Sequence, residues 1–229
     1  MSVIPLTTIR PDDWIKQFDP SKRILTGKAY LTAKRVMDVA IIVLSLPAWI
    51  PLMMIVALML FIGSPGEPVI FVQQRTGKGG KRFKMYKFRT MVVNAEELKK
   101  ELATLNDSGD LAGPLKLIDD PRVTPIGHFL RKTSLDELPQ VINVLLGDMS
   151  LVGPRPTSWS PESYKLWHTE RLDVLPGITG LWQIFGRGSE DFDEWLRWDI
   201  RYLERQCLLL DILILIRTFT AVFTHRGAR

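Results

Sequence analysis

The chain has 229 residues, enough for one domain of ordinary size with an appendage. Its 46% hydrophobic and 24% charged residues exclude wholesale disorder and fibrous or collagen-like classes. A formal net charge of +5 favours anionic partners over cationic ones. The single cysteine excludes an internal disulfide, and the three scattered histidines lack zinc-ligand spacing, so a reducing, cytosol-facing setting is expected.

The longest apolar segment covers residues 39–62, which carry no charge. Its length of about two dozen residues falls within the range of a membrane helix. Pro47 and Pro51 lie in its middle, where each removes a backbone donor and bends or breaks a helix. Basic residues flank the segment on both sides, and a spanning helix would place one basic cluster on the wrong side of the membrane. The residues by themselves leave a spanning helix and a re-entrant hairpin as alternatives, and favour a buried core helix less.

The remainder of the chain has the pattern of a mixed α/β domain. Helical patterns at 138–146 and 191–205 alternate with short strand-like and glycine-rich segments. The apolar tail at 207–223 carries Asp211 and Arg217. This composition favours a helix that lies in the membrane interface over a second membrane span.

An acidic pair, Asp136 and Glu137, stands in the string Ser134-Leu-Asp-Glu137. Ser-x-x-Glu is also the pattern of a capping box at a helix start, so a structural role is one interpretation. The other interpretation is a carboxylate pair that holds Mg²⁺ or attacks an electrophile, with the basic Arg131 and Lys132 just before it. The string alone does not decide between them.

Two further residues are candidates for a site. Arg155 stands between Pro154 and Pro156, which restrict its backbone, so it suits a bidentate phosphate clamp; a rigid turn with a surface arginine is the alternative. Asp199 falls on the apolar stripe of the predicted helix at 191–205. Because an isolated buried charge is costly, Asp199 is either paired in the interior or facing a site.

Residues 75–89 form a basic stretch that also contains aromatic residues. Such interleaving is typical of proteins that bind single-stranded nucleic acid. Its position directly after a membrane-length segment favours lipid headgroups or a phosphate substrate instead. A non-catalytic membrane adaptor that binds anionic lipid or nucleic acid through this stretch is therefore the alternative to an enzyme.

Eight strings, in this order, resemble the bacterial sugar transferases of the monotopic phosphoglycosyl transferase family. They are Lys34-Arg35-x-x-Asp38, Lys87-Phe-Arg-Thr-Met91, Asp120-Pro-Arg-Val-Thr124, Ser134-Leu-Asp-Glu-Leu-Pro-Gln140, Gly147-Asp-Met-Ser150, Val152-Gly-Pro-Arg-Pro156, Pro176-Gly-Ile-Thr-Gly180 and Gln183-x-x-Gly-Arg187. The resemblance runs from about Lys34 to the C-terminus. Any one string is weak evidence, whereas the ordered set is specific.

The resemblance implies an enzyme that moves a sugar 1-phosphate from a UDP-sugar to undecaprenyl phosphate, with release of UMP. It implies Mg²⁺ as cofactor, the cytoplasmic face of the bacterial inner membrane as location, and a first step in exopolysaccharide, capsule, O-antigen or glycoprotein glycan assembly. Asp136 is then the nucleophile, through a covalent phosphosugar intermediate, and a metal ligand. The other implied site residues are Glu137 as its dyad partner, Arg155, Arg131, Arg89 and Lys87 as phosphate-binding residues, and Asp199 as a supporting carboxylate.

The expected fold is an α-rich mixed α/β catalytic domain on a proline-broken, re-entrant membrane hairpin with interfacial amphipathic helices. Residues 1–33 are an N-terminal extension for which an interfacial position is open, 34–66 the hairpin, 67–205 the catalytic domain, and 206–229 a C-terminal interfacial helix and tail. The hairpin residues singled out are Lys34, Arg35, Asp38 and Pro51. The bilayer is an expected partner, nucleic acid is not, and homo-oligomerisation is left open.

Two positions depart from the family pattern. Ile50 stands where the hairpin often has a serine before its proline, and Leu175 stands where many members carry Arg or Lys. The second departure predicts that one phosphate contact is missing. The sugar and the glycan pathway have no signature in the sequence.

Overall fold

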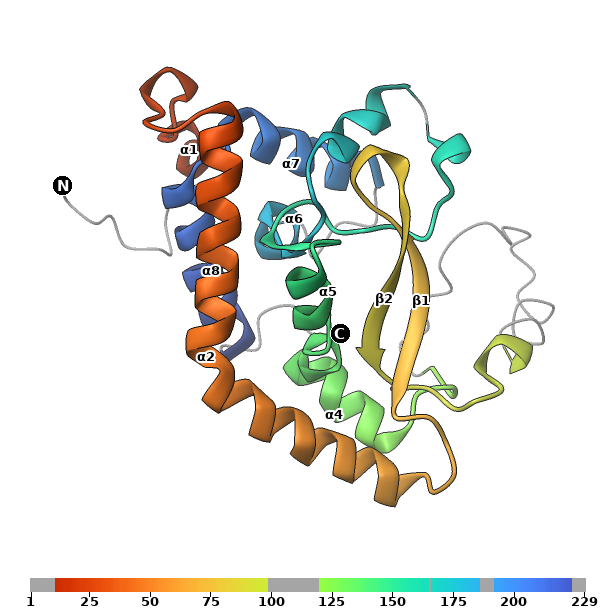
Figure 1. The fold of residues 1–229 in the computed structure, drawn as a ribbon. Helices are drawn as coiled ribbons and strands as arrows, with labels where there is room; N and C mark the ends of the chain where they lie inside the picture. The colour runs from red at the N-terminus through yellow and green to blue at the C-terminus, as the bar shows by residue number, and fades with distance from the viewer. Residues whose placement is uncertain (1–10, 99–119, 165, 186–191, 224–229) are drawn as a thin grey trace.

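The computed structural model of the chain describes residues 11–98, 120–164, 166–185 and 192–223 (Figure 1). The elements along the chain are α1 (Pro11–Lys16), η1 (Pro20–Lys22), α2 (Gly27–Gly63), β1 (Ile70–Thr76), η2 (Lys78–Gly80), β2 (Arg82–Phe88), α4 (Pro125–Thr133), η3 (Leu135–Glu137), α5 (Gln140–Leu146), β3 (Ser150–Val152), η4 (Pro161–Ser163), η5 (Leu166–Asp173), β4 (Gly177–Thr179), α6 (Leu181–Phe185), α7 (Phe192–Arg205) and α8 (Leu208–Phe223). The fold is the helix-rich mixture of α and β that the sequence predicts.

The strands of the described residues form two small sheets. β1 and β2 are antiparallel, with Ile70 opposite Phe88, and they are joined by a tight turn at Gly79 and Gly80, both with positive φ. β3 and β4 are parallel, and the chain between them crosses over through η4 and η5. The first sheet carries Lys87 toward the acidic pair, and the second fixes the segment around Arg155.

Helix α2 is a single helix of 37 residues and is the one described helix that is long and apolar enough to cross a membrane. Pro47 and Pro51 both lie inside it, and the helix changes direction along its length in Figure 1. Close to the first proline, the indole Nε1 of Trp49 donates to the backbone oxygen of Ile42 at 2.9 Å. The predicted break into two helices is not confirmed, because the remaining helical hydrogen bonds carry the helix past both prolines.

The two halves of α2 pack against different parts of one body. Ile42, in the first half, belongs to the main hydrophobic core. Val56 and Leu60, in the second half, are buried in a separate cluster with Phe88 and Leu130. A straight helix of this length would extend about 55 Å, so it is the bend that lets both halves contact the same domain.

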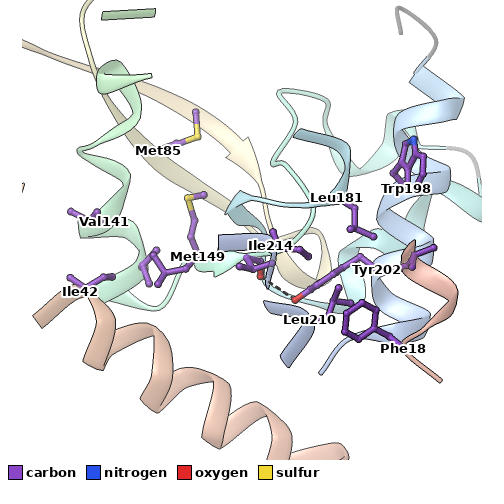
Figure 2. Packing of buried hydrophobic residues seen from close by; sticks show 14 of the residues in the cluster. Phe18, Ile42, Met85, Val141, Met149, Leu181, Trp198, Tyr202, Leu210 and Ile214 are labelled. Atoms are coloured by element: carbon purple, nitrogen blue, oxygen red, sulfur yellow. Dashed lines mark hydrogen bonds between the residues drawn. The ribbon is translucent and has the colours of Figure 1, made fainter. Parts of the chain in front are cut away.

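The main core lies between α5, the β3–β4 sheet, α7 and α8 (Figure 2). Met149, Leu210 and Ile214 are fully buried there, and the Tyr202 hydroxyl oxygen lies 3.3 Å from the backbone oxygen of Val152. The N-terminal extension contributes three buried side chains to this core, those of Trp14, Ile15 and Phe18. Part of the extension is thus packed into the domain.

Helix α8 carries two charges that suggested an interfacial position. Asp211 is fully buried and accepts hydrogen bonds from Lys34 at 3.0 Å, Tyr30 at 2.9 Å and Tyr202 at 2.6 Å. The guanidinium carbon of Arg217 lies 4.0 Å from the ring centroid of Trp14. Internal partners therefore account for both charges, and the interfacial position of α8 is not confirmed.

Candidate active site

The acidic pair lies in a tight turn between α4 and α5. Helix α4 ends at Ser134, which has a left-handed backbone (φ 57°) and whose N–H donates to the carbonyls of Leu130 and Arg131. The single 3-10 turn η3 then presents Asp136 and Glu137. The Ser134 side chain makes no capping hydrogen bond to this turn. The capping-box interpretation is therefore wrong, because Ser134 closes the preceding helix.

Glu137 is the centre of a partly buried ion-pair cluster. Lys87 from β2 donates to its Oε1 at 2.9 Å. Arg155 binds the same carboxylate with both terminal nitrogens, Nη1 to Oε2 at 3.3 Å and Nη2 to Oε1. Burial raises the pKa of Glu137, but the attraction of Arg155 and Lys87 outweighs it and holds the pKa far below its usual range. Glu137 is therefore a permanent anion that fixes two cations.

Asp136 has a different environment. Its Oδ2 lies 4.0 Å from the Lys87 ammonium, and within the part of the chain that is described its carboxylate accepts no hydrogen bond. Burial raises the pKa of Asp136, while Lys87, Arg155 and Arg131 lower it less. The two adjacent carboxylates thus differ. Glu137 is bound by two cations, whereas Asp136 accepts no hydrogen bond from the described residues and can bind a substrate or a metal ion.

The two remaining predicted phosphate-binding residues, Arg131 and Arg89, have different surroundings. Arg131, at the end of α4, donates through Nε to the Thr90 hydroxyl at 3.0 Å, and its charge acts on Asp136. Arg89 instead pairs with Glu67 at 3.0 Å, in the segment that follows α2. Arg89 lies one residue beyond the end of β2, and it does not share a partner with Lys87.

The backbone of the Arg155 segment is bound along its whole length. The carbonyl of Pro154 accepts from the N–H of Gly177 at 2.8 Å, and that of Thr157 from the N–H of Thr76 at 2.9 Å. Gly153 and Gly177 allow this close approach, because a Cβ on Gly177 would lie 2.1 Å from the backbone nitrogen of Gly153. The conformation predicted from the flanking prolines is thus held by a neighbouring strand.

Asp199 lies away from the acidic pair but connects to it. It is buried on α7 and forms an ion pair of 2.7 Å with Arg171 of η5. The Arg171 guanidinium also donates to the backbone oxygen of Arg155. Sequence reasoning placed Asp199 in a supporting role and missed Arg171, which has no motif of its own; a buried acid on α7 indicates only that some cation must meet it.

Three of the predicted hairpin residues connect α2 to the domain. Lys34 pairs with Asp211, and Asp38 accepts from the Ser150 hydroxyl at 2.6 Å. Arg35 donates to two carbonyls at the C-terminal end of α5, those of Val144 and Leu145. Pro51 lies further along α2 and takes no part in these contacts.

The basic stretch at 75–89 is largely occupied by internal contacts. Arg75 donates to the Pro156 carbonyl at 3.4 Å and Arg82 to the Trp159 carbonyl at 2.9 Å, while Lys87 and Arg89 pair with carboxylates. Burial lowers the pKa of Arg75 to about 10. These four cations have internal partners, whereas Lys78, Lys81 and Lys84 of the same stretch are exposed.

The side chains of the site can be compared with the ligands that the expected Mg²⁺ would need. No cluster of three or more Asp, Glu, His or Cys side chains suited to a metal occurs in the described ranges. Protein-bound Mg²⁺ is commonly held by one or two carboxylates together with substrate phosphates. Asp136, whose oxygens accept no hydrogen bond from the described residues, fits that arrangement, whereas Glu137 is engaged by two cations.

Comparison with known proteins identifies the family. Residues 29–225 match the family described as bacterial sugar transferase, and the chain belongs to it. It is 45% identical over 205 residues to galactosyl transferase CpsE of Streptococcus agalactiae serotype III, covering 88% of this chain and 44% of that protein. It is 44% identical over 199 residues to undecaprenyl-phosphate galactose phosphotransferase of Salmonella typhimurium, covering 85% and 41%.

A third relative is close to this chain in extent. Exopolysaccharide production protein ExoY of Sinorhizobium fredii is 40% identical over 200 residues, covering 86% of this chain and 88% of that protein. The chain thus spans less than half the length of the first two relatives and most of the third. The family resemblance seen in the ordered strings is confirmed.

Proposed function

We propose that this chain transfers a sugar 1-phosphate from a UDP-sugar to undecaprenyl phosphate and releases UMP. The observation that carries the proposal is the pair of adjacent carboxylates with opposite environments, Glu137 saturated by Lys87 and Arg155 and Asp136 held beside the same lysine. Family membership and the names of the two relatives that act on galactose derivatives point to the same reaction class.

In the first half-reaction, a carboxylate oxygen of Asp136 attacks the phosphorus that bears the sugar. The bond from that phosphorus to the bridging oxygen breaks, and the electron pair leaves with UMP. The product is an acyl phosphate between Asp136 and the sugar phosphate. A positioned carboxylate nucleophile splits one difficult transfer into two easier ones.

In the second half-reaction, a phosphate oxygen of undecaprenyl phosphate attacks the same phosphorus. The bond to Asp136 breaks, the carboxylate is restored, and the sugar leaves as a diphosphate on the lipid. A soluble substrate and a lipid substrate therefore use one site in turn, which predicts ping-pong kinetics.

The cations around the pair have distinct tasks in this scheme. An anion that attacks a pyrophosphate meets like-charge repulsion, which nearby positive charge must reduce. Glu137 holds Lys87 and Arg155 in place, so both cations are fixed before the substrate arrives. Arg131 is anchored through Nε on Thr90, and its terminal nitrogens, which bind no other side chain or carbonyl of the described residues, approach a phosphate. Arg89, paired with Glu67, keeps a structural role.

Mg²⁺ is part of the proposal. Asp136 together with phosphate oxygens of the substrate would hold it, and the ion would neutralise the charge of the pyrophosphate. The chain's own contribution is a carboxylate that is kept from other hydrogen-bond partners among the described residues. A dependence of UMP release on added Mg²⁺, abolished by chelation, tests this part.

The membrane arrangement we propose is a re-entrant α2 on the cytoplasmic face of the bacterial inner membrane. It is supported by the contact of both halves of α2 with the same domain. Gly63, the last residue of α2, also lies so close to α4 that a Cβ would be 2.4 Å from the Ile126 side chain. A straight spanning helix would separate its two ends by the full thickness of the bilayer.

The test combines two measurements on the purified full chain in lipid. UMP release is assayed with UDP-galactose, UDP-glucose and their N-acetylated forms, with undecaprenyl phosphate and Mg²⁺. Intact-mass spectrometry then follows the protein with the preferred UDP-sugar and no lipid acceptor, where a sugar-phosphate adduct is expected. UMP release without an adduct in wild-type protein would exclude the covalent route, and no release from any UDP-sugar would exclude the reaction itself.

A further inference from the structure

A buried arginine of η5 connects α7 to the Arg155 segment. Arg171 is 6% exposed and its guanidinium has two partners, the carboxylate of Asp199 at 2.7 Å and the backbone oxygen of Arg155. Asp199 is 3% exposed, so both members of the ion pair lie in the interior. A buried pair of this kind is costly to desolvate and can often be replaced by apolar residues without loss of stability. Stability alone therefore gives no reason for its presence.

The contact with Arg155 supplies a reason. Each carbonyl from Pro154 to Thr157 has its own donor: a backbone N–H of Gly177, then Arg171, then the Arg75 side chain, and a backbone N–H of Thr76. The carbonyl bound by Arg171 is that of the residue whose side chain reaches Glu137. The backbone from which the Arg155 guanidinium extends is thus fixed by a cation that is itself fixed by a buried acid.

Arg171 has no room for a direct contact with substrate. The space between Arg155, Tyr164 and Arg171 is a cavity of about 10 Å³, which holds about one water molecule. Arg155, in contrast, has a side chain that is 35% exposed. A substrate can reach Arg155 and not the residue beneath it.

We infer that Arg171, held by Asp199, is a positioning residue that fixes the backbone of Arg155 and thereby aims its guanidinium at the acidic pair and the substrate phosphates. The kinetic part of this inference rests on the proposed function. A displacement of about 1 Å at a positioning group costs roughly 100-fold in rate, because the long Arg155 side chain carries a small backbone shift to the reacting atoms.

The variant to test is Arg171→Lys. Lysine keeps the charge next to Asp199 but, as a single ammonium on a flexible stem, does not reproduce the planar fork that binds two partners at once. Arg205→Lys is the matched control: Arg205 lies on α7, and it also donates to a backbone carbonyl, that of Phe18 at 3.1 Å, outside the acidic pair. Asp199→Asn removes the other member of the ion pair and serves if Arg171→Lys fails to fold.

Two readouts separate positioning from mere structure. The first is hydrogen–deuterium exchange of a peptide covering 153–158, which needs no enzymatic activity. The second is kcat for UMP release, measured in Arg171→Lys, in Arg155→Lys and in the double variant. A residue that acts only through Arg155 adds little once Arg155 is already changed, whereas independent effects multiply.

We expect faster exchange at 153–158 and a fall of about 10- to 100-fold in kcat for Arg171→Lys. The double variant should be no more than about threefold slower than Arg155→Lys, since the effects share one route. Arg205→Lys should leave exchange in this peptide and kcat within about twofold of wild type. Unchanged exchange in Arg171→Lys, or losses that multiply in the double variant, would overturn the inference. If wild type releases no UMP, the proposed function fails while the exchange measurement still decides the positioning role.

Discussion

The two adjacent carboxylates should differ sharply in what their removal costs, and Glu137→Gln against Asp136→Asn measures the difference. Glutamine keeps the size of Glu137 but removes the charge that pairs with Lys87 and Arg155. Two partly buried cations then lose their partner. Asparagine at 136 removes a carboxylate that accepts no hydrogen bond from the described residues.

The magnitude follows from the burial of the partners. Breaking a fully buried ion pair on one side costs about 3–5 kcal/mol. The side chains of Lys87 and Arg155 keep 16% and 35% of their exposure, so solvent screening reduces the expected cost to about 2–3 kcal/mol. For a chain of this size that is a fall in Tm of roughly 5–10 °C. For Asp136→Asn we expect a change within about 0.5 kcal/mol, since burial of the ionised form already opposes folding.

The assay is thermal unfolding of both variants and wild type in the same detergent at neutral pH, followed by the adduct measurement. Asp136→Asn should unfold like wild type yet form no sugar-phosphate adduct, because an amide is not a nucleophile. Glu137→Gln should unfold earlier and still form the adduct, more slowly. Stability and chemistry are thereby assigned to different residues of the pair.

Equal Tm values for the two variants, or a larger loss in Asp136→Asn, would show that the ion-pair cluster around Glu137 does not stabilise the fold as described. An adduct in Asp136→Asn would remove Asp136 as nucleophile. Glu137 would then be the next residue to test, with direct attack by the lipid phosphate as the competing route.

Three further outcomes are expected. Gly127→Ala should destabilise the fold by about 2–3 kcal/mol in thermal unfolding, because the new Cβ would lie 2.0 Å from the Thr90 carbonyl oxygen; a normal Tm would contradict this packing. Burial raises the pKa of Asp199 to about 6, so kcat should fall below pH 6 as the carboxylate that holds Arg171 is protonated, and Asp199→Asn should lose this part of the pH profile. Single cysteines at Lys28, in the first turn of α2, and at Pro68, beyond its last residue, each in a chain with Cys207→Ser, should both react with a reagent that reaches only the cytoplasmic face; labelling from opposite faces would exclude the re-entrant arrangement.

The arrangement at Glu137 changes how the phosphate-binding residues are understood. Arg155 was predicted as a bidentate clamp on phosphate, but both its terminal nitrogens bind Glu137. A substrate phosphate must therefore share Arg155 with the carboxylate or replace it. In either case Glu137 holds the Arg155 and Lys87 side chains in place before the substrate binds. This preorganisation lowers the entropic cost of ordering two long side chains on binding.

Local properties of this protein could be predicted from the sequence alone. The helix at 138–146 appears as α5, and Gly147 ends it with φ 87°, because a glycine after an apolar helical run accepts the left-handed conformation without strain. The helix predicted at 191–205 appears as α7. Asp199 is paired with Arg171 in the protein interior, which is one of the two alternatives that the sequence predicts. Short-range spacing determines these features. The family strings are also short-range patterns, and their order along the chain was enough to recognise the family.

Partners that come from distant parts of the chain were decided by the tertiary structure. Lys87 and Arg155 reach Glu137 from 50 and 18 residues away, and Arg171 meets Asp199 without any local signal. The capping box failed for the same reason: the backbone of Ser134 is committed to the end of α4, which the string itself does not contain. Periodicity and turn residues specify how a segment folds, whereas the partner of a buried charge depends on which segments the whole chain brings together.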